Sequence, residues 1–320
     1  MKVLILGITG FAGSTMYRFM TQVSGNRLYG TFRHSTRNRD IAEEFCHATL
    51  LECDINDVYS IEKVLSIVKP DIIFHFASYV SVFSSFNNPL PTLKTNIIGT
   101  TNLLEGIRKI IPQAKILMPG SAEEYGAVSM EKMPILENCP LNPSNPYAIS
   151  KKVQEEIGFY YFKQIGLNIY FTRTFHYTGP LQPLGFVCSD FTRQVIDIEN
   201  GNKTSIKVGN LEARRDFTDI RDVVNAYWKI INKGMAGEVY NVCSGKSIKI
   251  QEILNKLIIL SRKDILIEID KKKLRPSDVP DFVGSNIKLK KIGWEPQYSI
   301  DSSLLDLLNW WRKKMRESLA

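Results

Sequence analysis

The stretch Gly7-Ile8-Thr9-Gly10-Phe11-Ala12-Gly13 decides the fold, because it joins an apolar strand at residues 2–6 to a segment with helical spacing. Glycines at this spacing let a turn tighten and let backbone N–H groups approach a pyrophosphate, whose charge the N-terminus of a helix favours. Three glycines alone are weak evidence, since glycines also occur in ordinary turns. Here the strand, the turn and the helix agree. We therefore predict a dinucleotide site formed by Gly7, Thr9, Gly10, Phe11, Ala12 and Gly13.

Short β-rich runs alternate with helical stretches through the first half of the chain. The predicted strands span residues 2–6, 27–32, 48–53, 71–76, 114–118 and 168–173. This alternation predicts a parallel sheet with crossover helices. Runs such as Ile72-Ile73-Phe74 are apolar at every position, as expected for strands that helices cover on both faces. The sequence therefore predicts an α/β protein with a doubly wound Rossmann sheet.

A stretch rich in Pro and Asn begins near residue 119 and interrupts this pattern. Order resumes with a helix predicted over residues 147–165, and later helices are predicted over residues 190–199, 220–233, 250–261 and 302–316. We expect residues 1–174 to form the dinucleotide-binding domain with the catalytic residues. Residues 175–320 are expected to form mainly a smaller α/β substrate lobe that is interleaved with the first domain.

The composition excludes several classes of protein. Hydrophobic residues make up 44% of the 320 residues, but no apolar run is long enough to cross a bilayer or to act as a secretory signal. The net charge of +8 is spread along the chain, which favours solvated surfaces over a nucleic-acid partner. Five scattered cysteines indicate neither a metal site nor disulfides. We expect a cytoplasmic protein without a membrane, nucleic-acid or metal partner.

The end of the second predicted strand indicates which dinucleotide binds. NAD sites typically place an acid there, about twenty residues after the glycine turn, whereas an arginine accommodates the 2′-phosphate of NADP. This chain has Arg33 at that point, with Arg37 and Arg39 beyond it and no acid. We therefore expect NADP. The alternative is that Arg33 is an ordinary surface residue and that NAD also binds.

Three residues after the later strands complete the expected cofactor site. Asp54 and Ile55 follow the third strand, where a carboxylate can accept a hydrogen bond from the adenine amino group. Asp54 is alternatively the N-cap of the next helix. Ala77 follows the fourth strand.

Tyr147 and Lys151 stand four residues apart in a predicted helix, so both side chains lie on one face. A phenol is a poor acid or base near neutral pH unless a nearby cation lowers its pKa, and Lys151 is placed to do so. Ser121 follows the strand at residues 114–118, where it can share a hydrogen bond with the reacting oxygen. These positions belong at the carboxyl ends of the strands, where such sheets bind ligands.

The glycine turn, Ser121, Tyr147 and Lys151 together resemble the extended short-chain dehydrogenase/reductases, and this combination is far more specific than any one part. The resemblance implies that Tyr147 is the general acid/base at a sugar oxygen, that Lys151 binds the nicotinamide ribose, and that Ser121 orients the carbonyl. It also implies that Asn96 supports a proton relay; an ordinary surface asparagine is the alternative. A homodimer formed by the helices near Asn96 and Tyr147 is a further implication. Dinucleotide-binding regulators usually lack the Tyr–Lys pair, so an enzyme is favoured over a redox sensor.

Two later segments, residues 208–217 and 275–279, resemble the GDP-binding segments of the GDP-mannose 4,6-dehydratases and GDP-6-deoxy-4-keto-mannose reductases. The resemblance implies that Arg215 and Arg275 bind the diphosphate through forked guanidinium contacts that lysine would not reproduce. It further implies that Asp278 holds the ribose hydroxyls and that Asn210 lies against guanine.

The remaining expected substrate contacts are Val187, Val208 and His176. Residues 173–180 resemble a family stretch that flanks the nicotinamide and the substrate, and His176 stands there in place of the usual asparagine. The His176 ring either donates the same hydrogen bond in its neutral form or marks a different sugar.

Within this group, the sequence favours the reductase. A 4,6-dehydratase needs an extra acid/base for carbons 5 and 6, and Glu123 can supply it, but the reductases resemble this segment too. Residues 184–192 resemble the reductases more closely, with Asp190 where dehydratases typically have lysine, and the chain is shorter than typical dehydratases. We predict NADPH-dependent reduction of the 4-keto group of a GDP-4-keto-6-deoxyhexose, giving a GDP-6-deoxy sugar such as GDP-rhamnose. The alternatives are a GDP-mannose 4,6-dehydratase and an epimerase, dehydratase or reductase of another GDP-sugar such as GDP-heptose.

Overall fold

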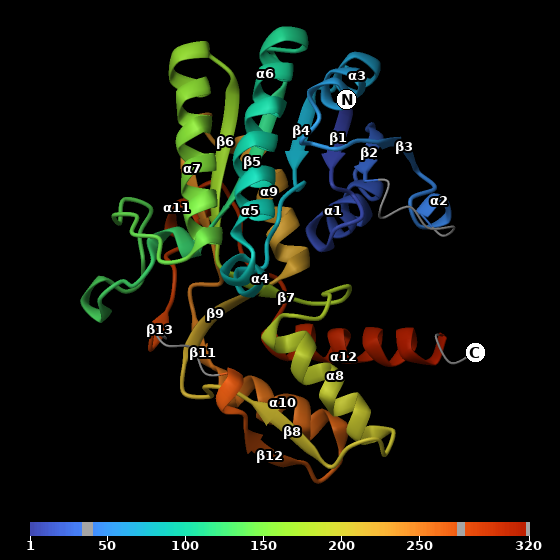
Figure 1. Ribbon diagram of the computed structural model, residues 1–320, viewed down its shortest axis with the longest axis vertical. Coiled ribbons are helices and arrows are strands. Elements are labelled where there is room, and N and C mark those ends of the chain that lie inside the picture. Colours follow the sequence, from blue (N-terminus) through green and yellow to red (C-terminus); the bar gives the residue numbers. More distant parts are fainter. Residues whose placement is uncertain (34–40, 274–278, 318–320) are drawn as a thin grey trace.

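A seven-stranded parallel sheet forms the larger part of the molecule, and a smaller lobe lies beneath it (Figure 1). The computed structural model describes residues 1–33, 41–273 and 279–317. The sheet contains β1 (Lys2–Leu6), β2 (Arg27–Phe32), β3 (Ala48–Glu52), β4 (Ile72–His75), β5 (Lys115–Ser121), β6 (Asn168–Thr174) and β10 (Val239–Val242). Its strand order is β10-β6-β5-β4-β1-β2-β3, and every neighbouring pair is parallel. The predicted doubly wound sheet is confirmed, because the strand order reverses between β1 and β4.

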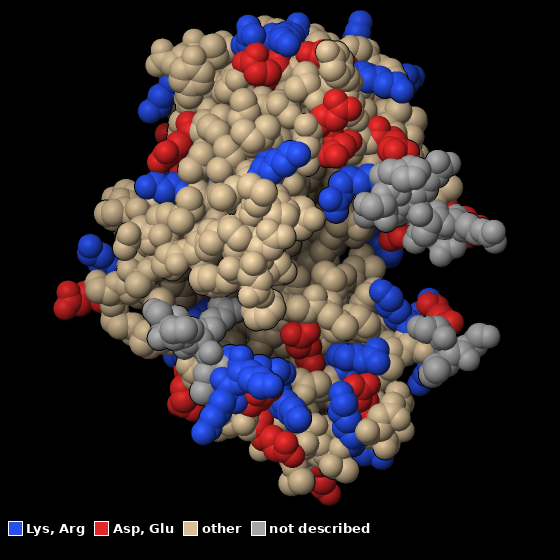
Figure 2. Space-filling model, viewed as in Figure 1, with Lys and Arg blue, Asp and Glu red and all other residues tan. Residues whose placement is uncertain are grey.

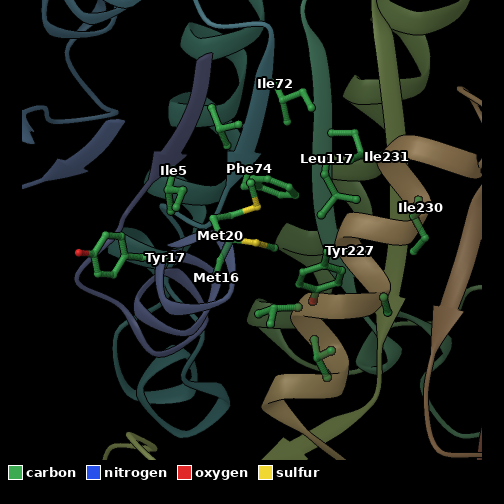
Figure 3. Close-up of a cluster of buried hydrophobic side chains, with 14 of the residues drawn as sticks. Ile5, Met16, Tyr17, Met20, Ile72, Phe74, Leu117, Tyr227, Ile230 and Ile231 are labelled. Atoms are coloured by element: carbon green, nitrogen blue, oxygen red, sulfur yellow. The ribbon is translucent and has the colours of Figure 1, made fainter. Parts of the chain in front are cut away.

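Helices cover both faces of this sheet. One face carries α1 (Phe11–Thr21), α2 (Ile41–Glu44), α9 (Ile220–Lys233) and α11 (Ile287–Lys291). The other carries α3 (Val58–Val68), α6 (Thr100–Ile110), α7 (Pro146–Tyr160) and the π-helical η5 (Tyr161–Ile165). Figure 3 shows Ile5 and Phe74 on the first face, close to Met20 of α1. Leu4 and Ile73, the alternate positions, pack on the second face, which is why the strands are apolar at every position.

Short elements connect the strands near the carboxyl edge of the sheet. α4 (Val82–Asn87), α5 (Pro89–Leu93) and the π-helical η2 (Lys94–Gly99) lead from β4 into α6. η3 (Ala122–Tyr125) and η4 (Met130–Lys132) follow β5 and precede α7. The stretch rich in Pro and Asn therefore brings α7 back to the end of β5.

The smaller lobe has its own hydrophobic core. It is built from α8 (Val187–Glu199), β8 (Ser205–Val208), α10 (Ile250–Ser261), β12 (Leu266–Ile269), η6 (Lys271–Lys273) and α12 (Ile300–Glu317). A second sheet pairs β9 (Arg214–Asp219) with β7 (His176–Thr178), β11 (Ser247–Lys249) and β13 (Asp281–Phe282). The lobe is discontinuous in sequence. The segments before α9 and after β10 build the lobe, whereas α9 and β10 themselves pack with the main sheet.

Three findings concern the whole set of described residues. No helix among them has both the length and the apolar character that a membrane span requires. The five cysteines are all free. No group of three or more His, Cys, Asp or Glu side chains within the described ranges is arranged to hold a metal ion.

Candidate active site

The glycine turn between β1 and α1 has the geometry of an anion-binding cradle. Gly7 has a φ of +79°, which favours glycine, and a Cβ on Gly13 would lie 2.2 Å from the Gly7 carbonyl oxygen. α1 begins without a side-chain cap and with no acid in its first turn. Its N-terminal N–H groups and its dipole therefore suit a pyrophosphate. The residues present fit the dinucleotide predicted from the sequence.

Three strand ends converge at this turn. The Gly7 N–H donates to the Thr31 hydroxyl of β2 at 3.0 Å. A Cβ on Gly7 would lie 3.0 Å from the backbone nitrogen of Ala77, which follows β4. The structure therefore brings the residues expected at the turn together with the residue expected after β4. The partly exposed side chains among them are those of Thr9, Phe11, Ala12 and Ala77.

Arg33 follows β2 at the edge of this region. It is exposed, and its guanidinium carbon lies 5.8 Å from the centre of the Tyr79 ring in the loop after β4. No acid occurs between Arg27 and Arg33, so this strand end offers a cation rather than a carboxylate to an adenosine ribose. Arg37 and Arg39 lie outside the described residues.

The structure decides one of the two roles considered for Asp54. α3 is capped by Asp57, whose carboxylate accepts a hydrogen bond from the Tyr59 N–H at 3.0 Å. The N-cap alternative for Asp54 is therefore wrong; its carboxylate accepts from the Asn56 N–H at 2.9 Å, in the turn before the helix. Asp54 remains exposed, so the predicted adenine contact is sterically open. The Ile55 side chain is buried in the core, which leaves only its backbone for a cofactor contact.

Tyr147 and Ser121 meet where α7 begins and β5 ends. Both residues are 8% exposed, and a hydrogen bond joins their side chains. Burial raises the pKa of the Tyr147 phenol well above its usual value, the Tyr177 phenol adds to the rise, and the hydrogen bond with Ser121 opposes it. The phenol is therefore protonated at neutral pH, as a general acid must be.

Lys151 lies one turn after Tyr147 on α7, and its ammonium group is buried. Its Nζ donates to the Pro119 carbonyl oxygen at 2.7 Å and to the Gln154 side-chain oxygen at 2.9 Å. Burial lowers the pKa of Lys151 to about 8, and the Glu124 carboxyl opposes this shift. The expected net lowering of the Tyr147 pKa is wrong for this structure, because burial of the phenol outweighs the other influences on it.

Asn96 links α7 to the loop after β4. It is 1% exposed and lies in the π-helical η2, a kind of turn that is frequent at functional sites. Its Nδ2 donates to the Ser150 hydroxyl at 2.9 Å and to the Tyr79 carbonyl oxygen at 3.0 Å. Its Oδ1 accepts from the Ser78 hydroxyl and the Tyr79 N–H, each at 2.8 Å. The alternative of an ordinary surface asparagine is therefore wrong.

Glu123 lies in η3, beside the start of α7. Its carboxylate accepts a hydrogen bond from the Asn145 side-chain amide at 3.1 Å, and its N–H donates to the Ser121 hydroxyl at 3.2 Å. Asn145 is the N-cap of α7, where its Oδ1 accepts from the Ala148 N–H at 2.8 Å. The structure therefore brings Glu123 to Ser121 and to the helix that carries Tyr147.

Arg215 on β9 belongs to residues 208–217, the first of the two segments predicted to bind GDP. Its guanidinium group donates to the backbone carbonyl oxygens of Arg214 and Val279, each at 2.8 Å. Arg275 and Asp278, the other residues expected there, lie outside the described residues. Two backbone carbonyl oxygens therefore fix the position of the Arg215 guanidinium group.

The other expected substrate contacts differ in exposure. His176 on β7 is partly buried, and its ring centre lies 5.6 Å from that of Phe217. Val187 begins α8 and is partly exposed, and Asn210 is exposed after β8. Val208, by contrast, is fully buried in the core of the smaller lobe. Only the backbone of Val208 is therefore available for the predicted substrate contact.

Three polar residues at the site were not predicted from the sequence. The Tyr177 ring lies 5.7 Å from that of Phe11, and its phenol raises the pKa of Tyr147. Ser85 is fully buried and accepts a hydrogen bond from the Tyr147 N–H at 3.3 Å, and Gln154 accepts one from Lys151. Tyr177 lies within residues 173–180, and the resemblance of this segment to a family stretch that flanks the nicotinamide was a usable signal. Nothing in the local sequence marks Ser85 or Gln154.

Known sequences are similar to this chain over most of its length. The model of the family described as GDP-mannose 4,6 dehydratase matches residues 4–306. The GDP-6-deoxy-D-mannose reductase of Pseudomonas aeruginosa is 33% identical over 78% of this chain and 82% of that protein. The GDP-mannose 4,6 dehydratase 1 of Arabidopsis thaliana is 28% identical over 93% of this chain and 86% of that protein.

Solved structures share the architecture over almost the whole chain. RMD from Pseudomonas aeruginosa, complexed with NADPH, has a TM-score of 0.84 and 28% identity, and the match covers 98% of this chain and 99% of that one. The UDP-glucose 4-epimerase of Thermotoga maritima, with UDP-glucose, has a TM-score of 0.87 and 26% identity, covering 98% and 100%. Both lobes described above are therefore part of the shared fold.

Proposed function

The chain belongs to the GDP-mannose 4,6-dehydratase family, and from this premise we propose that it reduces the 4-keto group of a GDP-4-keto-6-deoxyhexose with NADPH. The product is a GDP-6-deoxy sugar such as GDP-rhamnose. The observation that carries the proposal is the hydrogen-bonded pair of Tyr147 and Ser121, in which burial keeps the phenol protonated. A protonated phenol at the carboxyl edge of a doubly wound sheet is suited to protonating a carbonyl oxygen as it is reduced.

The cofactor lies, on this proposal, along the glycine turn from Gly7 to Gly13. The uncapped N-terminus of α1 supports binding of its pyrophosphate, and the exposed Arg33 supports a 2′-phosphate and hence NADP over NAD. Asp54 is placed to bind the adenine end. The solved relative that is complexed with NADPH supports the same choice.

The chain's own residues then divide the chemistry. NADPH, when bound, supplies the hydride for carbon 4 of the sugar. Ser121 holds the keto oxygen, and Tyr147 donates its phenolic proton to that oxygen. Lys151 exchanges its bonds to Pro119 and Gln154 for the ribose hydroxyls of the cofactor, and its positive charge then favours the phenolate that forms.

The GDP part of the substrate fits the β9 side of the site. Arg215 supplies a guanidinium fork for the diphosphate. Arg275, which lies outside the described residues, is proposed to supply a second one. Asn210 and Asp278 are proposed to contact guanine and its ribose. Val187 at the exposed start of α8 and His176 on β7 complete the lining near the sugar.

We also propose that the chain works as a cytoplasmic homodimer. Figure 2 shows few charged residues over α4, α5, η2 and α7. The large apolar side chains exposed along these elements are Phe83, Phe86, Leu90, Ile98, Ile149 and Tyr160. Contiguous apolar surface of this kind is typical of an interface between subunits. The free cysteines fit a reducing compartment.

One incubation tests the reaction. The purified protein is given a GDP-4-keto-6-deoxyhexose with NADPH, and the loss of NADPH absorbance is compared with the GDP-6-deoxy sugar found by mass spectrometry. We expect one NADPH consumed for each ketone reduced. A parallel incubation contains GDP-mannose without reductant; formation of a 4-keto product there would contradict the reductase and support the dehydratase.

The dehydratase is the second candidate, and the position of Glu123 favours it. The Glu123 carboxylate contacts Asn145, and the Glu123 N–H contacts Ser121, so this residue lies where a second acid/base for carbons 5 and 6 would be needed. Asp190 favours the reductase instead, because dehydratases typically have lysine at this position. Its carboxylate accepts a hydrogen bond from the Gly185 N–H at 2.8 Å and so fixes the turn before α8. Together with the identity to the reductase, this leaves reduction as the better-supported reaction.

A further inference from the structure

Glu124, the neighbour of Glu123 in η3, carries a carboxyl group that is fully buried behind the catalytic residues. Its Oε1 accepts a hydrogen bond from the Ser121 N–H at 2.6 Å. Its Oε2 has no hydrogen-bond partner among the described residues. A Cβ on Gly120 would lie 2.5 Å from Oε1, so the chain has a glycine where this carboxyl needs room. A buried polar atom left without a partner requires an explanation.

The charged groups around Glu124 come from three elements. Arg173 on β6 donates to both oxygens of Glu155 on α7, at 2.6 and 3.0 Å, and its remaining hydrogen bonds go to uncharged groups. Its Nε lies 3.9 Å from the Glu124 Oε2, too far for a hydrogen bond. Glu123, on the same turn as Glu124, is bonded to other groups. Arg173 is an ion-pair partner of Glu124, and its charge acts on the Glu124 pKa more strongly than any other cation. Lys151 on α7 is the second cation whose charge acts on Glu124, and its own hydrogen bonds go to neutral oxygens.

We propose that Glu124 is a positioning residue of the active site: its carboxyl fixes the Ser121 backbone and provides the buried counter-charge for Lys151. The inference rests on the proposed function for the roles of Ser121 and Lys151. It adds a residue that acts through both of them and touches neither substrate nor cofactor. Oε1 accepts the hydrogen bond from the Ser121 backbone, and the negative charge of the ionised carboxylate, which both oxygens share, acts on Lys151.

The ionisation of the pair follows from its surroundings. Burial and the negative charge of Glu155 raise the pKa of Glu124 to about 8, and burial lowers the pKa of Lys151 to about 8. Where Glu124 is ionised, its negative charge opposes the effect of burial on Lys151. The lysine therefore keeps its proton to a higher pH than burial alone would allow.

Two substitutions separate the two roles. Glu124→Gln keeps the volume and an oxygen for the Ser121 N–H but cannot ionise. Glu124→Asp keeps an ionisable group but draws the carboxyl away from Ser121. Glu156→Gln is the control, because it makes the same chemical change at an exposed carboxylate on α7.

The first measurement needs no sugar. The dissociation constant of NADPH is followed by fluorescence from neutral to alkaline pH, where binding weakens as Lys151 loses its proton. We expect the midpoint to fall by about one pH unit in Glu124→Gln and to stay unchanged in Glu156→Gln. Glu124→Asp should keep the midpoint while lowering kcat with the keto sugar. A Glu124→Gln midpoint equal to that of the unsubstituted protein overturns the counter-charge.

Two further results keep the inference separate from the reaction. If no GDP-keto sugar is reduced, the proposed function fails, while the NADPH profile still decides the role of Glu124. If Glu124→Gln does not fold, infrared spectra of the unsubstituted protein decide instead. A protonated carboxyl band at neutral pH that changes when NADPH binds is the expected result, and its absence overturns the proposal.

Discussion

Asn145 bonds at the same time to its own helix and to Glu123: its Oδ1 accepts from the Ala148 N–H at 2.8 Å, and its Nδ2 donates to the Glu123 carboxylate at 3.1 Å. One side chain therefore fixes the start of α7 and the acid next to it. Because Tyr147 lies in the first turn of α7, the position of the phenol depends on this cap.

Replacing Asn145 should affect stability and catalysis separately. Asn145→Ala removes the cap, and we expect the free energy of unfolding to fall by about 1 kcal/mol, as for other N-cap losses. Asn145→Asp keeps an oxygen for the Ala148 N–H but places a second carboxylate against Glu123. It should preserve most of the cap while lowering kcat. Urea unfolding and steady-state rates measure the two effects, with the exposed Asn142→Ala as control. Equal stability of Asn145→Ala and the unsubstituted protein would show that the cap contributes nothing.

Stability should depend on pH through Glu124. Its folded pKa of about 8 lies above the ordinary value of 4.5, so the folded protein holds this proton more tightly than the unfolded chain between these values. The stabilisation is fully present below the ordinary pKa and is lost as the pH rises toward the folded pKa, by at most about 1.4 kcal/mol per pH unit for one proton.

Glu124→Gln removes this proton and should flatten that part of the profile. The free energy of unfolding is measured by urea titration at several pH values for the unsubstituted protein, Glu124→Gln and the exposed control Glu156→Gln. We expect the control to follow the unsubstituted protein. Parallel profiles for all three proteins would mean that Glu124 titrates normally.

The choice of cofactor should depend on Arg33. Its guanidinium group is exposed beside Tyr79 and the glycine turn, so a 2′-phosphate can reach it. Arg33→Ala should lower kcat/KM for NADPH about tenfold to a hundredfold, the loss expected for one or two charged hydrogen bonds, and should leave NADH unaffected. Arg27→Ala, an exposed arginine at the start of the same strand, is the control. An equal loss with both cofactors would assign Arg33 to the fold rather than to the phosphate.

The main sheet was predictable because its strands are apolar on both faces and each is followed by a helix with its own spacing. β10 was not recognised as the seventh strand, since the run Val239–Val242 pairs with β6 from about seventy residues earlier in the chain, and local sequence carries no register for such a pairing. One of the two roles considered for Asp54, the N-cap of α3, was wrong for a local reason. Asp54 and Asp57 both precede the helix, and only the backbone geometry selects Asp57.

Much of the active site was also predictable from motif spacing, but its electrostatics were not. Tyr147 and Lys151 share a helix face because of their spacing, whereas Gly120 and Glu124 reach them from the end of β5. The desolvation that sets the charge state of the phenol and the ammonium arises only when these elements pack together. Sequence reasoning therefore placed the Tyr–Lys pair correctly and misjudged the direction of the Tyr147 pKa shift.

The role of Tyr147 gives the most direct test of the chemistry. Tyr147→Phe removes only the hydroxyl, so the first turn of α7 and its cap should persist and NADPH should still bind. Loss of a general acid typically costs about 10²–10⁴-fold, and we expect kcat with the keto sugar to fall within that range. Tyr160→Phe, an exposed tyrosine at the end of the same helix, should retain the full rate. Because burial holds the proton on Tyr147, the rate should not decline at neutral pH through loss of that proton. Turnover by Tyr147→Phe at the full rate would contradict the assigned role, because another group would then have to be the acid. Glu123 is the group positioned to supply that proton.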